Sequence, residues 1–319
     1  MTVLGALALI LVAAGPSWAE KEPPATFLYK WGEPGNGTGQ FRGVRGIVAF
    51  DRTASDRILV VVADTGRDLV RAFTSDMMFI DKWGVRGTEP GQFAEPRGVA
   101  IDHQGKLLVV DAANHRIQKT EVGTSTFLEK PGETLLVFGK RGSGEGEFEM
   151  PTGVAVTPAN EILVVDTENH RLQIFDERGE FLRSIGKKGT GPGEFRRPTY
   201  AALDSAGNIF VSDTDNNRIQ KLDAKGNFVA QIGSIGNQLG RVAEPKGIAL
   251  DAAGNLWVVD RRNHRVQKFD AEGNSQGVFG KQGGRAGEFN YPEDISIDSK
   301  GRLYVTDGMN GRIQVFRPN

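Results

Sequence analysis

Short apolar runs separated by turn-forming residues dominate the chain from residue 27 onward. In one stretch these runs occupy residues 247–251, 256–260, 265–269 and 276–279, and clusters such as Asp-x-x-Gly separate them. The second run is continuously apolar, as in a strand buried on both faces, and the third alternates between apolar and polar residues. Turn signals at intervals of roughly 8 to 12 residues predict short β-strands and argue against helices.

This four-run pattern recurs six times, and an aspartate ends the second run of each copy. The aspartates are Asp64, Asp111, Asp166, Asp213, Asp260 and Asp307. The gaps between them are 47, 55, 47, 47 and 47 residues, and the long gap reflects an eight-residue insertion around residues 123–133. Four-stranded units of this size cannot bury both faces alone, but radial stacking buries them and leaves only short edges. The predicted fold is therefore all-β, a six-bladed β-propeller.

The two ends of the repeat region predict a closed ring. The last copy ends with the run at 312–316 and lacks a fourth strand. A matching strand stands at the beginning, because residues 27–32 (Phe-Leu-Tyr-Lys-Trp-Gly) resemble residues 79–84 (Phe-Ile-Asp-Lys-Trp-Gly). We therefore expect the N-terminal strand to pair with the C-terminal blade, so that the propeller spans residues 27–319.

Residues 1–19 have the features of a signal peptide. An apolar run extends from Val3 to Ala14, and residues 17–19 (Ser-Trp-Ala) place small residues at the two positions that a signal peptidase inspects. The alternative, a transmembrane anchor, needs roughly 20 apolar residues, more than this run provides. Because the leader has no Lys or Arg, a longer upstream start is a second alternative. We expect cleavage before Glu20, a short linker at 20–26, and a secreted or periplasmic mature protein without an integral membrane segment.

Composition narrows the function classes. Lys plus Arg total 39 and Asp plus Glu total 40, so no bulk charge draws the protein to nucleic acid or to an anionic membrane. The absence of cysteine excludes disulfides, thiolate metal sites and thiol catalysis. A charged partner must therefore be recognised by a local patch.

Internal repetition separates scaffold residues from candidate site residues. Arginines recur five residues after five of the aspartates, at Arg116, Arg171, Arg218, Arg265 and Arg312. A residue type that every blade needs is expected to be structural, and a partly buried guanidinium requires a carboxylate or carbonyl partners. The Gly-rich stretches at 139–148 and 186–195 are predicted to be blade-to-blade crossovers, because a phosphate loop would lead into a helix.

The turn motifs after the aspartates carry a family resemblance. Residues 114–117 (Asn-His-Arg-Ile), 169–172 (Asn-His-Arg-Leu) and 263–266 (Asn-His-Arg-Val) resemble the NHL repeat, named for Asn-His-Leu. The resemblance covers residues 27–316. The first copy departs from it, because the turn after Asp64 has lost the Asn, His and Arg and about five extra residues precede that aspartate.

Differences between blades predict a binding site on one rim of the ring. The starts of the first strands, the turns between second and third strands and the crossovers should all lie on this rim. The rim candidates are Arg45, Arg97, Lys246, Arg261, Arg262, Glu293 and Asp294. We expect basic groups of blades one, two and five to face acids of blade six at the mouth of the central channel. Closed folds place ligands on such loops, which predicts a non-enzymatic, monomeric module that binds a peptide, glycan or protein.

Three histidines raise a competing hypothesis. His115, His170 and His264 occupy the same turn position, and imidazole is a good zinc ligand. The chain resembles the peptidyl-hydroxyglycine amidating lyases of the NHL family, and that resemblance implies a zinc ion near the axis held by a histidine of this turn and one of a Pro-His-Asp segment. Here the segment reads Pro-Glu-Asp at 292–294, and the disulfides of that branch are absent. A zinc- or calcium-dependent lyase or hydrolase thus remains the alternative to histidines that only satisfy turn backbone groups.

The RNA-binding, ubiquitin-ligase branch of the family is a third possibility. That branch implies a strongly basic face and attached RING or coiled-coil segments. Neither is found in this sequence, and export also argues against it. No nucleic-acid partner is therefore predicted.

Overall fold

The apolar runs that end in the recurring aspartates form the second strand of each blade. A computed structural model describes residues 22–51, 58–122 and 133–319. Every residue of these second strands is buried, as expected for strands covered on both faces. The second strands are β5 (Ile58–Asp64), β9 (Leu107–Asp111), β15 (Ile162–Asp166), β19 (Ile209–Asp213), β23 (Leu256–Asp260) and β27 (Leu303–Asp307).

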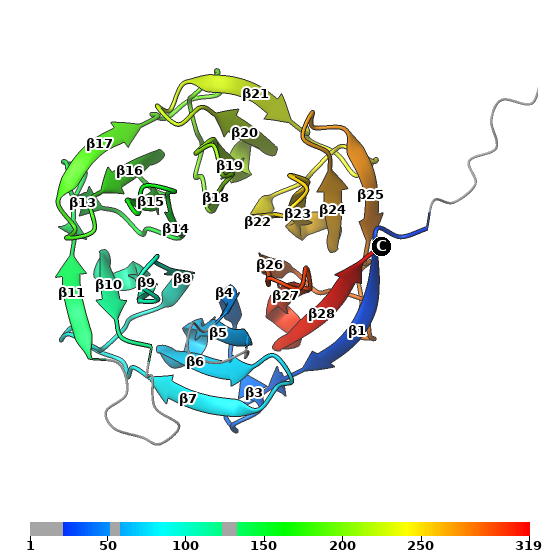
Figure 1. The fold of residues 1–319 in the computed structure, drawn as a ribbon, viewed down its shortest axis with the longest axis horizontal. Coiled ribbons are helices and arrows are strands. Elements are labelled where there is room, and N and C mark those ends of the chain that lie inside the picture. Colours follow the sequence, from blue (N-terminus) through cyan, green and yellow to red (C-terminus); the bar gives the residue numbers. More distant parts are fainter. Residues whose placement is uncertain (1–21, 52–57, 123–132) are drawn as a thin grey trace, which may run out of the picture.

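Each second strand lies in a four-stranded antiparallel sheet, and six such sheets surround a central axis (Figure 1). The innermost strands are β4 (Val44–Asp51), β8 (Pro96–Ile101), β14 (Val154–Val156), β18 (Ala201–Leu203), β22 (Pro245–Leu250) and β26 (Pro292–Ile297). The third strands are β6 (Leu69–Thr74), β10 (Arg116–Thr120), β16 (Arg171–Phe175), β20 (Arg218–Leu222), β24 (Arg265–Phe269) and β28 (Arg312–Pro318). The outermost strands are β7 (Phe79–Trp83), β11 (Thr134–Phe138), β17 (Phe181–Ile185), β21 (Phe228–Ile232), β25 (Ser275–Phe279) and β1 (Ala25–Trp31).

The hydrophobic core lies between the blades. Six apolar clusters fill the spaces between neighbouring sheets, including the space between the last blade and the first. The cluster between blades six and one contains Trp31, Val62, Phe73 and Tyr304. This arrangement confirms the predicted six-bladed propeller, in which neighbouring blades bury each other's faces.

Crossovers between blades begin with short parallel pairings. Strands β2 (Glu33–Pro34) and β3 (Gln40–Phe41) form one pair, and β12 (Lys140–Arg141) and β13 (Glu147–Phe148) form another. A fully buried apolar residue anchors each crossover, namely Phe41, Phe93, Phe148, Phe195, Val242 or Phe289. At Gly186 the chain has φ +85°, and a Cβ there would lie 2.4 Å from the Phe195 ring. Glycine is required at such a position for both reasons.

The ring closes as the sequence predicted. Strand β1 pairs antiparallel with β28, with Phe27 opposite Phe316 and Trp31 opposite Ile313. The first and last strands of the propeller lie side by side in Figure 1. Strand β1 begins at Ala25, two residues before Phe27. The N-terminal strand therefore completes blade six.

Blade five shows how far the strand bounds could be predicted. The second and third strands match the expected runs at 256–260 and 265–269, whereas β22 begins two residues before the expected run at 247–251 and β25 one residue before the run at 276–279. The signal peptide, its cleavage site and most of the insertion at 123–133 lie outside the described residues. In the described part of the chain, no helix has the length and apolarity to cross a membrane.

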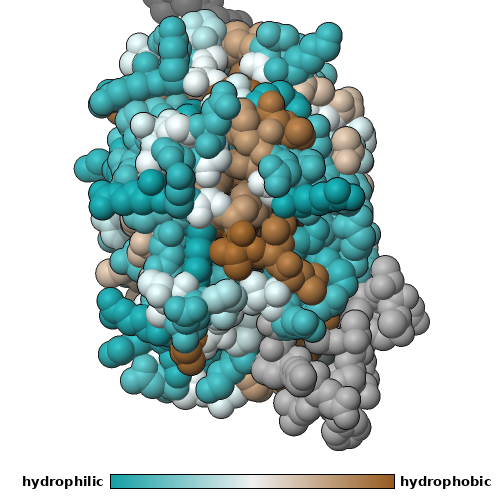
Figure 2. Space-filling model, turned by 90° about the vertical axis from the view of Figure 1, so that its left-hand side faces the viewer, coloured by the Kyte–Doolittle hydropathy of each residue, from teal (hydrophilic) through white to brown (hydrophobic). Residues whose placement is uncertain are grey.

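The side of the ring that carries β11 and β17 is mostly hydrophilic. Figure 2 shows one apolar strip among hydrophilic side chains, on the side of the ring where β11 and β17 lie. Leu135 of β11 and Leu182 of β17 are each 46% exposed.

Candidate functional site

The recurring aspartates hold each crossover against its blade. In blade four, one carboxylate oxygen of Asp213 accepts the backbone N–H of Arg196 at 2.7 Å, and the other accepts Nε of Arg218 at 2.7 Å and amide N–H groups of Asn216 and Gln220. Arg218 also donates to two crossover carbonyls. Equivalent bonds surround Asp111, Asp166, Asp260 and Asp307. The arginine and aspartate repeat is thus scaffold, as predicted.

In blade one, a different residue holds the crossover against the blade. Leu69 stands where the other blades have arginine, and Arg71 stands seven residues after Asp64, where the others have glutamine. The buried Arg71 guanidinium donates to Asp64 at 3.4 Å and to the crossover carbonyls of Gln40 and Thr38. Arg71 therefore makes the kind of contacts that an arginine and a glutamine make in the other blades.

The turn histidines join neighbouring blades. Nδ1 accepts a backbone N–H of the next crossover in each case: from Met150 to His115 at 3.1 Å, from Arg197 to His170 at 2.9 Å and from Tyr291 to His264 at 3.1 Å. In blades one and four, Asp68 and Asn217 accept the equivalent bond. Burial lowers the pKa of His170 and of His264, which favours the neutral ring that this acceptor role requires. The histidines therefore satisfy turn backbone groups.

These histidines do not assemble into a metal site. Their Nδ1 atoms are engaged by backbone N–H groups, and Glu293, which stands where the lyase segment has its histidine, is paired with Arg261. In residues 22–51, 58–122 and 133–319, no three or more His, Asp or Glu side chains are grouped in a way that could hold a metal ion. The residues present do not fit the zinc that the lyase resemblance implies.

The rim around the axis is where the blades differ. Blades one, two, three and five have glycine at the point of closest approach of the innermost strands, and a Cβ on Gly98 or Gly153 would lie 2.5 Å from a carbonyl oxygen of the next blade. Blade four has Tyr200 at this position and blade six has Asp294. The residue just before it is Arg in blades one and two, Thr in blades three and four, Lys in blade five and Glu in blade six, so the channel mouth has no six-fold symmetry.

One cavity of about 220 Å³ occupies this mouth. It is lined by Arg45, Arg97, Thr152, Thr167, Arg197, Thr199, Tyr200, Thr214, Asp215, Lys246 and Glu293. These residues come from first-strand starts, second-to-third-strand turns and one crossover. The three segments that were expected to share a rim therefore meet in one cavity.

Five of the seven rim candidates lie in or beside this cavity. Arg45, Arg97, Lys246 and Glu293 line it, and Arg261 stands at its edge with Nε 3.1 Å from Glu293 and a terminal nitrogen 3.0 Å from Glu244. Burial, and then the positive charges around it, lower the pKa of Lys246 to about 8. The mouth therefore combines crowded cations with an acid that is already paired.

The other two candidates do not line the cavity. Arg262 is 70% exposed, pairs with Glu244 at 3.3 Å and lines a separate crevice with Gly236 and Gln238. Asp294 is buried and accepts the backbone N–H groups of Ile47 at 3.0 Å and of Ile295 at 2.8 Å. Asp294 thus ties blade six to blade one beside the mouth.

Seven of the eleven lining residues are not among the rim candidates, and Tyr200 and Arg197 are two examples. Tyr200 replaces the axis glycine of blade four, and the comparison that singled out Asp294 would have found it. Burial raises the pKa of the Tyr200 phenol well above its ordinary value. Arg197 comes from a crossover in which charged residues are common, so its position in the sequence did not indicate that it lines the cavity. It pairs with Glu168 at 2.8 Å.

The carboxyl group of Asp294 should make stability depend on pH. Burial raises its pKa to about 8, so between pH 4 and 8 the native state holds a proton that the unfolded state releases, and the group's contribution to stability falls as pH rises. Asp294→Ala leaves the Ile47 N–H without its acceptor and should lower the free energy of unfolding by about 1–3 kcal/mol near pH 5. Urea unfolding of both proteins at pH 5 and 8 should show a smaller difference at pH 8. A constant or growing difference would refute this assignment.

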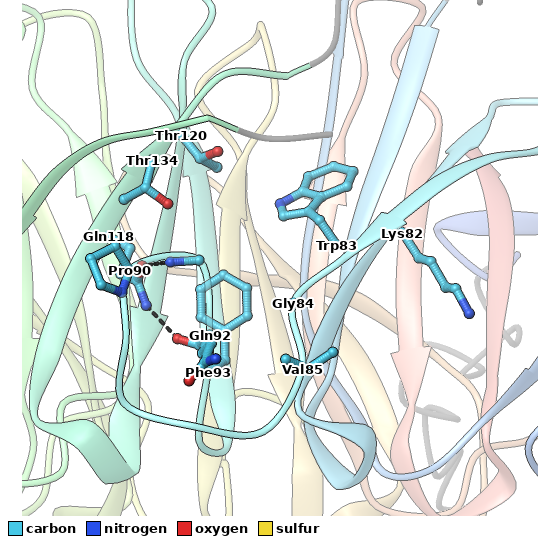
Figure 3. Close-up of a pocket in the computed structure, with 11 residues that line it drawn as sticks. Lys82, Trp83, Gly84, Val85, Pro90, Gln92, Phe93, Gln118, Thr120 and Thr134 are labelled. Carbon is cyan, nitrogen blue, oxygen red and sulfur yellow. Dashed lines mark hydrogen bonds between the residues drawn. The ribbon is translucent and has the colours of Figure 1, made fainter. Parts of the chain in front are cut away.

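A second hollow lies between the outer parts of blades one and two. It has a volume of about 600 Å³, and Figure 3 shows Trp83 across from Thr120 and Thr134, with Lys82 extending away. Gln118 is already bonded to the backbone of Gly91 and Gln92. A similar hollow of about 570 Å³ is lined by the matching residues at 30–33 and 37–40. Because this hollow recurs with the crossover, we assign it to the scaffold.

Comparisons with known proteins agree with this architecture. A family model for a six-bladed β-propeller matches residues 144–232, and the NHL repeat model matches residues 93–119, 243–269 and 289–316. The protein brain tumor of Drosophila melanogaster is 33% identical over 32% of this chain and 9% of its own length. A probable peptidyl-alpha-hydroxyglycine alpha-amidating lyase of Caenorhabditis elegans is 37% identical over 30% of this chain and 25% of its own length. The chain thus spans at most a quarter of either relative.

Solved structures show the same fold at low identity. A gluconolactonase from Xanthomonas campestris has a TM-score of 0.62 and 16% identity, with 88% of this chain and 87% of the other covered. At this identity the likeness concerns the fold alone. Repeats, blade number and ring closure lead to one conclusion: the chain belongs to the six-bladed β-propellers that are built of NHL repeats.

Proposed function

We propose that this propeller is a non-enzymatic binding module that acts outside the cytoplasm and holds a peptide, glycan or protein partner at the mouth of its central channel. The single observation that supports this proposal is the meeting of the blade-to-blade differences in one cavity. A ring that needed only to be stable could repeat one residue at the axis six times. Here the sequence places Arg, Arg, Thr, Thr, Lys and Glu at that position.

The scaffold around the cavity is rigid in a way that suits recognition. Thr152 and Thr199 are fixed by hydrogen bonds, because Thr152 contacts Thr167 at 2.6 Å and donates to the Thr199 carbonyl at 2.7 Å, while Thr199 contacts Thr214 at 2.7 Å. Loops held on a rigid frame are common places for binding residues. The mouth therefore supports binding without a large rearrangement.

The lyase alternative receives no support from the site. The turn histidines are engaged with the backbone and Glu293 is engaged with Arg261. No specific observation at the mouth favours bond-breaking chemistry over binding. We therefore propose binding alone.

A triple substitution tests this proposal. The variant Arg97→Ala, Lys246→Ala, Glu293→Ala removes three mouth side chains and should abolish binding to peptides or glycans that an array identifies for the natural protein. The matched control removes one Arg, one Lys and one Glu from exposed turns of the opposite rim, at Arg178, Lys225 and Glu272, and should retain binding. Equal binding by both variants, or no binding by the natural protein, would count against a binding site at the channel mouth.

A further inference from the structure

Within the part of the chain that the structure describes, three cations at the channel mouth form no salt bridge with a buried carboxylate. Among the described residues, neither Arg45 nor Lys246 forms a salt bridge, although both line the cavity. In residues 22–51, 58–122 and 133–319, the one salt bridge of Arg97 is with Glu95, at 3.1 Å, and that glutamate is 52% exposed. The buried Nε of Arg97 has no hydrogen-bond acceptor in the described part of the chain. The three cations come from blades one, two and five, so they approach one space from different sides.

The acids around them do not neutralise this charge. Four cationic and two acidic side chains line the cavity. Glu293 is 3.1 Å from Arg261 Nε, and Asp215 is 4.0 Å from Arg197, so each acid already faces another arginine. The mouth therefore carries an excess of positive charge inside a protein whose total charge is close to zero.

The state of Lys246 agrees with this charge excess. Burial lowers its pKa to about 8, and the repulsion from Arg261, Arg45 and Arg97 adds to the effect of burial, while Glu293 opposes it. A negative group placed among these cations would accept hydrogen bonds from them, which offsets the cost of burying Lys246. Its charge would also offset the repulsion between the cations.

The cationic side chains that line the mouth offer hydrogen-bond donors only. Arginine and lysine side chains donate and cannot accept. The hydroxyls of Thr152, Thr167 and Thr214 already donate to or contact protein atoms, with Thr167 2.8 Å from the Pro198 carbonyl and Thr214 2.8 Å from the Pro245 carbonyl. The complement of such a surface is a group that only accepts hydrogen bonds and carries negative charge.

We propose that the channel mouth binds an oxyanion, a carboxylate or phosphate group of the ligand, between Arg45, Arg97 and Lys246. This inference rests on the proposed function, which places the ligand at the mouth. The cavity of about 220 Å³ is smaller than the roughly 300–1,000 Å³ of sites that enclose drug-sized ligands. It therefore accepts the charged end of a ligand or a small anion, and the rest of a larger partner lies on the rim.

Calorimetric titration of the purified protein with two probes tests the inference. Sodium phosphate and sodium succinate are titrated separately at constant ionic strength, and sodium chloride is the blank. Saturable binding of either probe is expected, and the preferred probe shows whether the group is phosphate or carboxylate. Arg97→Gln and Lys246→Gln should each weaken binding about tenfold or more, as expected when a charged hydrogen bond is lost. Lys225→Gln on the opposite rim should leave the affinity unchanged.

A gain-of-affinity variant keeps the test independent of folding defects. Glu293→Gln removes a negative charge from the mouth and leaves the charge of Arg261 less compensated, so it should strengthen binding of the same probe. Failure of both probes to saturate the protein, or equal affinities in the natural protein and the Arg97 and Lys246 variants, would overturn the inference. If array ligands still require the mouth but neither anion competes with them, the proposed function stands and the oxyanion assignment falls. If the anions bind at the mouth while array ligands survive the triple substitution, the proposed function falls instead.

Discussion

A chain that starts at Gly32, and so lacks strand β1, should fail to give a cooperative unfolding transition. Blade six would lose its outermost strand, and β28 would expose its backbone edge to water and to other chains. Trp31 also packs in the core between blades six and one, with its ring 6.1 Å from that of Phe73 and 6.4 Å from that of Tyr304. Burial of one tryptophan contributes about 3–5 kcal/mol, so loss of the whole strand should consume most of a typical stability of roughly 5–15 kcal/mol.

Denaturant unfolding followed by tryptophan fluorescence and circular dichroism checks this result. A chain that starts at Glu22 retains β1 and is the matched control. The milder variant Trp31→Ala should fold but should lose about 3–5 kcal/mol of unfolding free energy. Equal denaturant midpoints for the chains that start at Gly32 and Glu22 would show that closure through β1 is not needed.

Asp213→Ala should destabilise the propeller by about 3–5 kcal/mol, the second largest effect that we expect. The substitution removes the acceptor for Arg218, Asn216, Gln220 and one crossover N–H at once. Arg218 is 7% exposed, so its guanidinium would remain largely buried without its carboxylate. Loss of one partner of a buried ion pair is costly because the other charge is left uncompensated.

Lys187→Ala provides the control in the crossover that the Asp213 network holds. Lys187 is 77% exposed and lies 3.4 Å from Glu194, so its ion pair is screened by water and its loss should change stability by less than about 1 kcal/mol. Urea midpoints of the two variants can be compared directly. If Asp213→Ala shifts the urea midpoint as little as Lys187→Ala does, the hydrogen bonds of Asp213 do not stabilise the crossover.

The ring could be predicted from the sequence because its determinants are local and repeated. The constant spacing of the aspartates fixed the blade length, and the likeness of residues 27–32 to 79–84 identified the closing strand. Strand pairing then follows from connectivity, because consecutive antiparallel strands joined by short turns lie next to each other.

Blade one shows where repetition loses its predictive value. The Asn, His and Arg of the other blades are absent after Asp64, so the sequence predicts that blade one lacks the motif. Arg71 supplies the bonds from a position two residues further along, and both positions lie on the same face of strand β6. Side chains two residues apart share a face, but the sequence does not reveal which of them reaches the carboxylate.

The channel mouth was only partly predictable for a similar reason. Comparison of the blades located Arg45, Arg97, Lys246 and Glu293 because strand starts at equivalent positions converge on the axis. It could not show that Asp294 turns toward the Ile47 N–H or that Arg262 points outward to Glu244. Those orientations depend on which partner lies nearest after folding.

Anomalous scattering can test most directly whether the mouth of the channel binds an oxyanion. Crystals soaked in selenate, which has the charge and shape of sulfate, should show an anomalous peak within hydrogen-bond distance of the Arg97 guanidinium and the Lys246 ammonium. The peak should be absent from crystals of Lys246→Gln soaked in the same way. Selenate at other surface positions with none at the mouth would contradict the assignment.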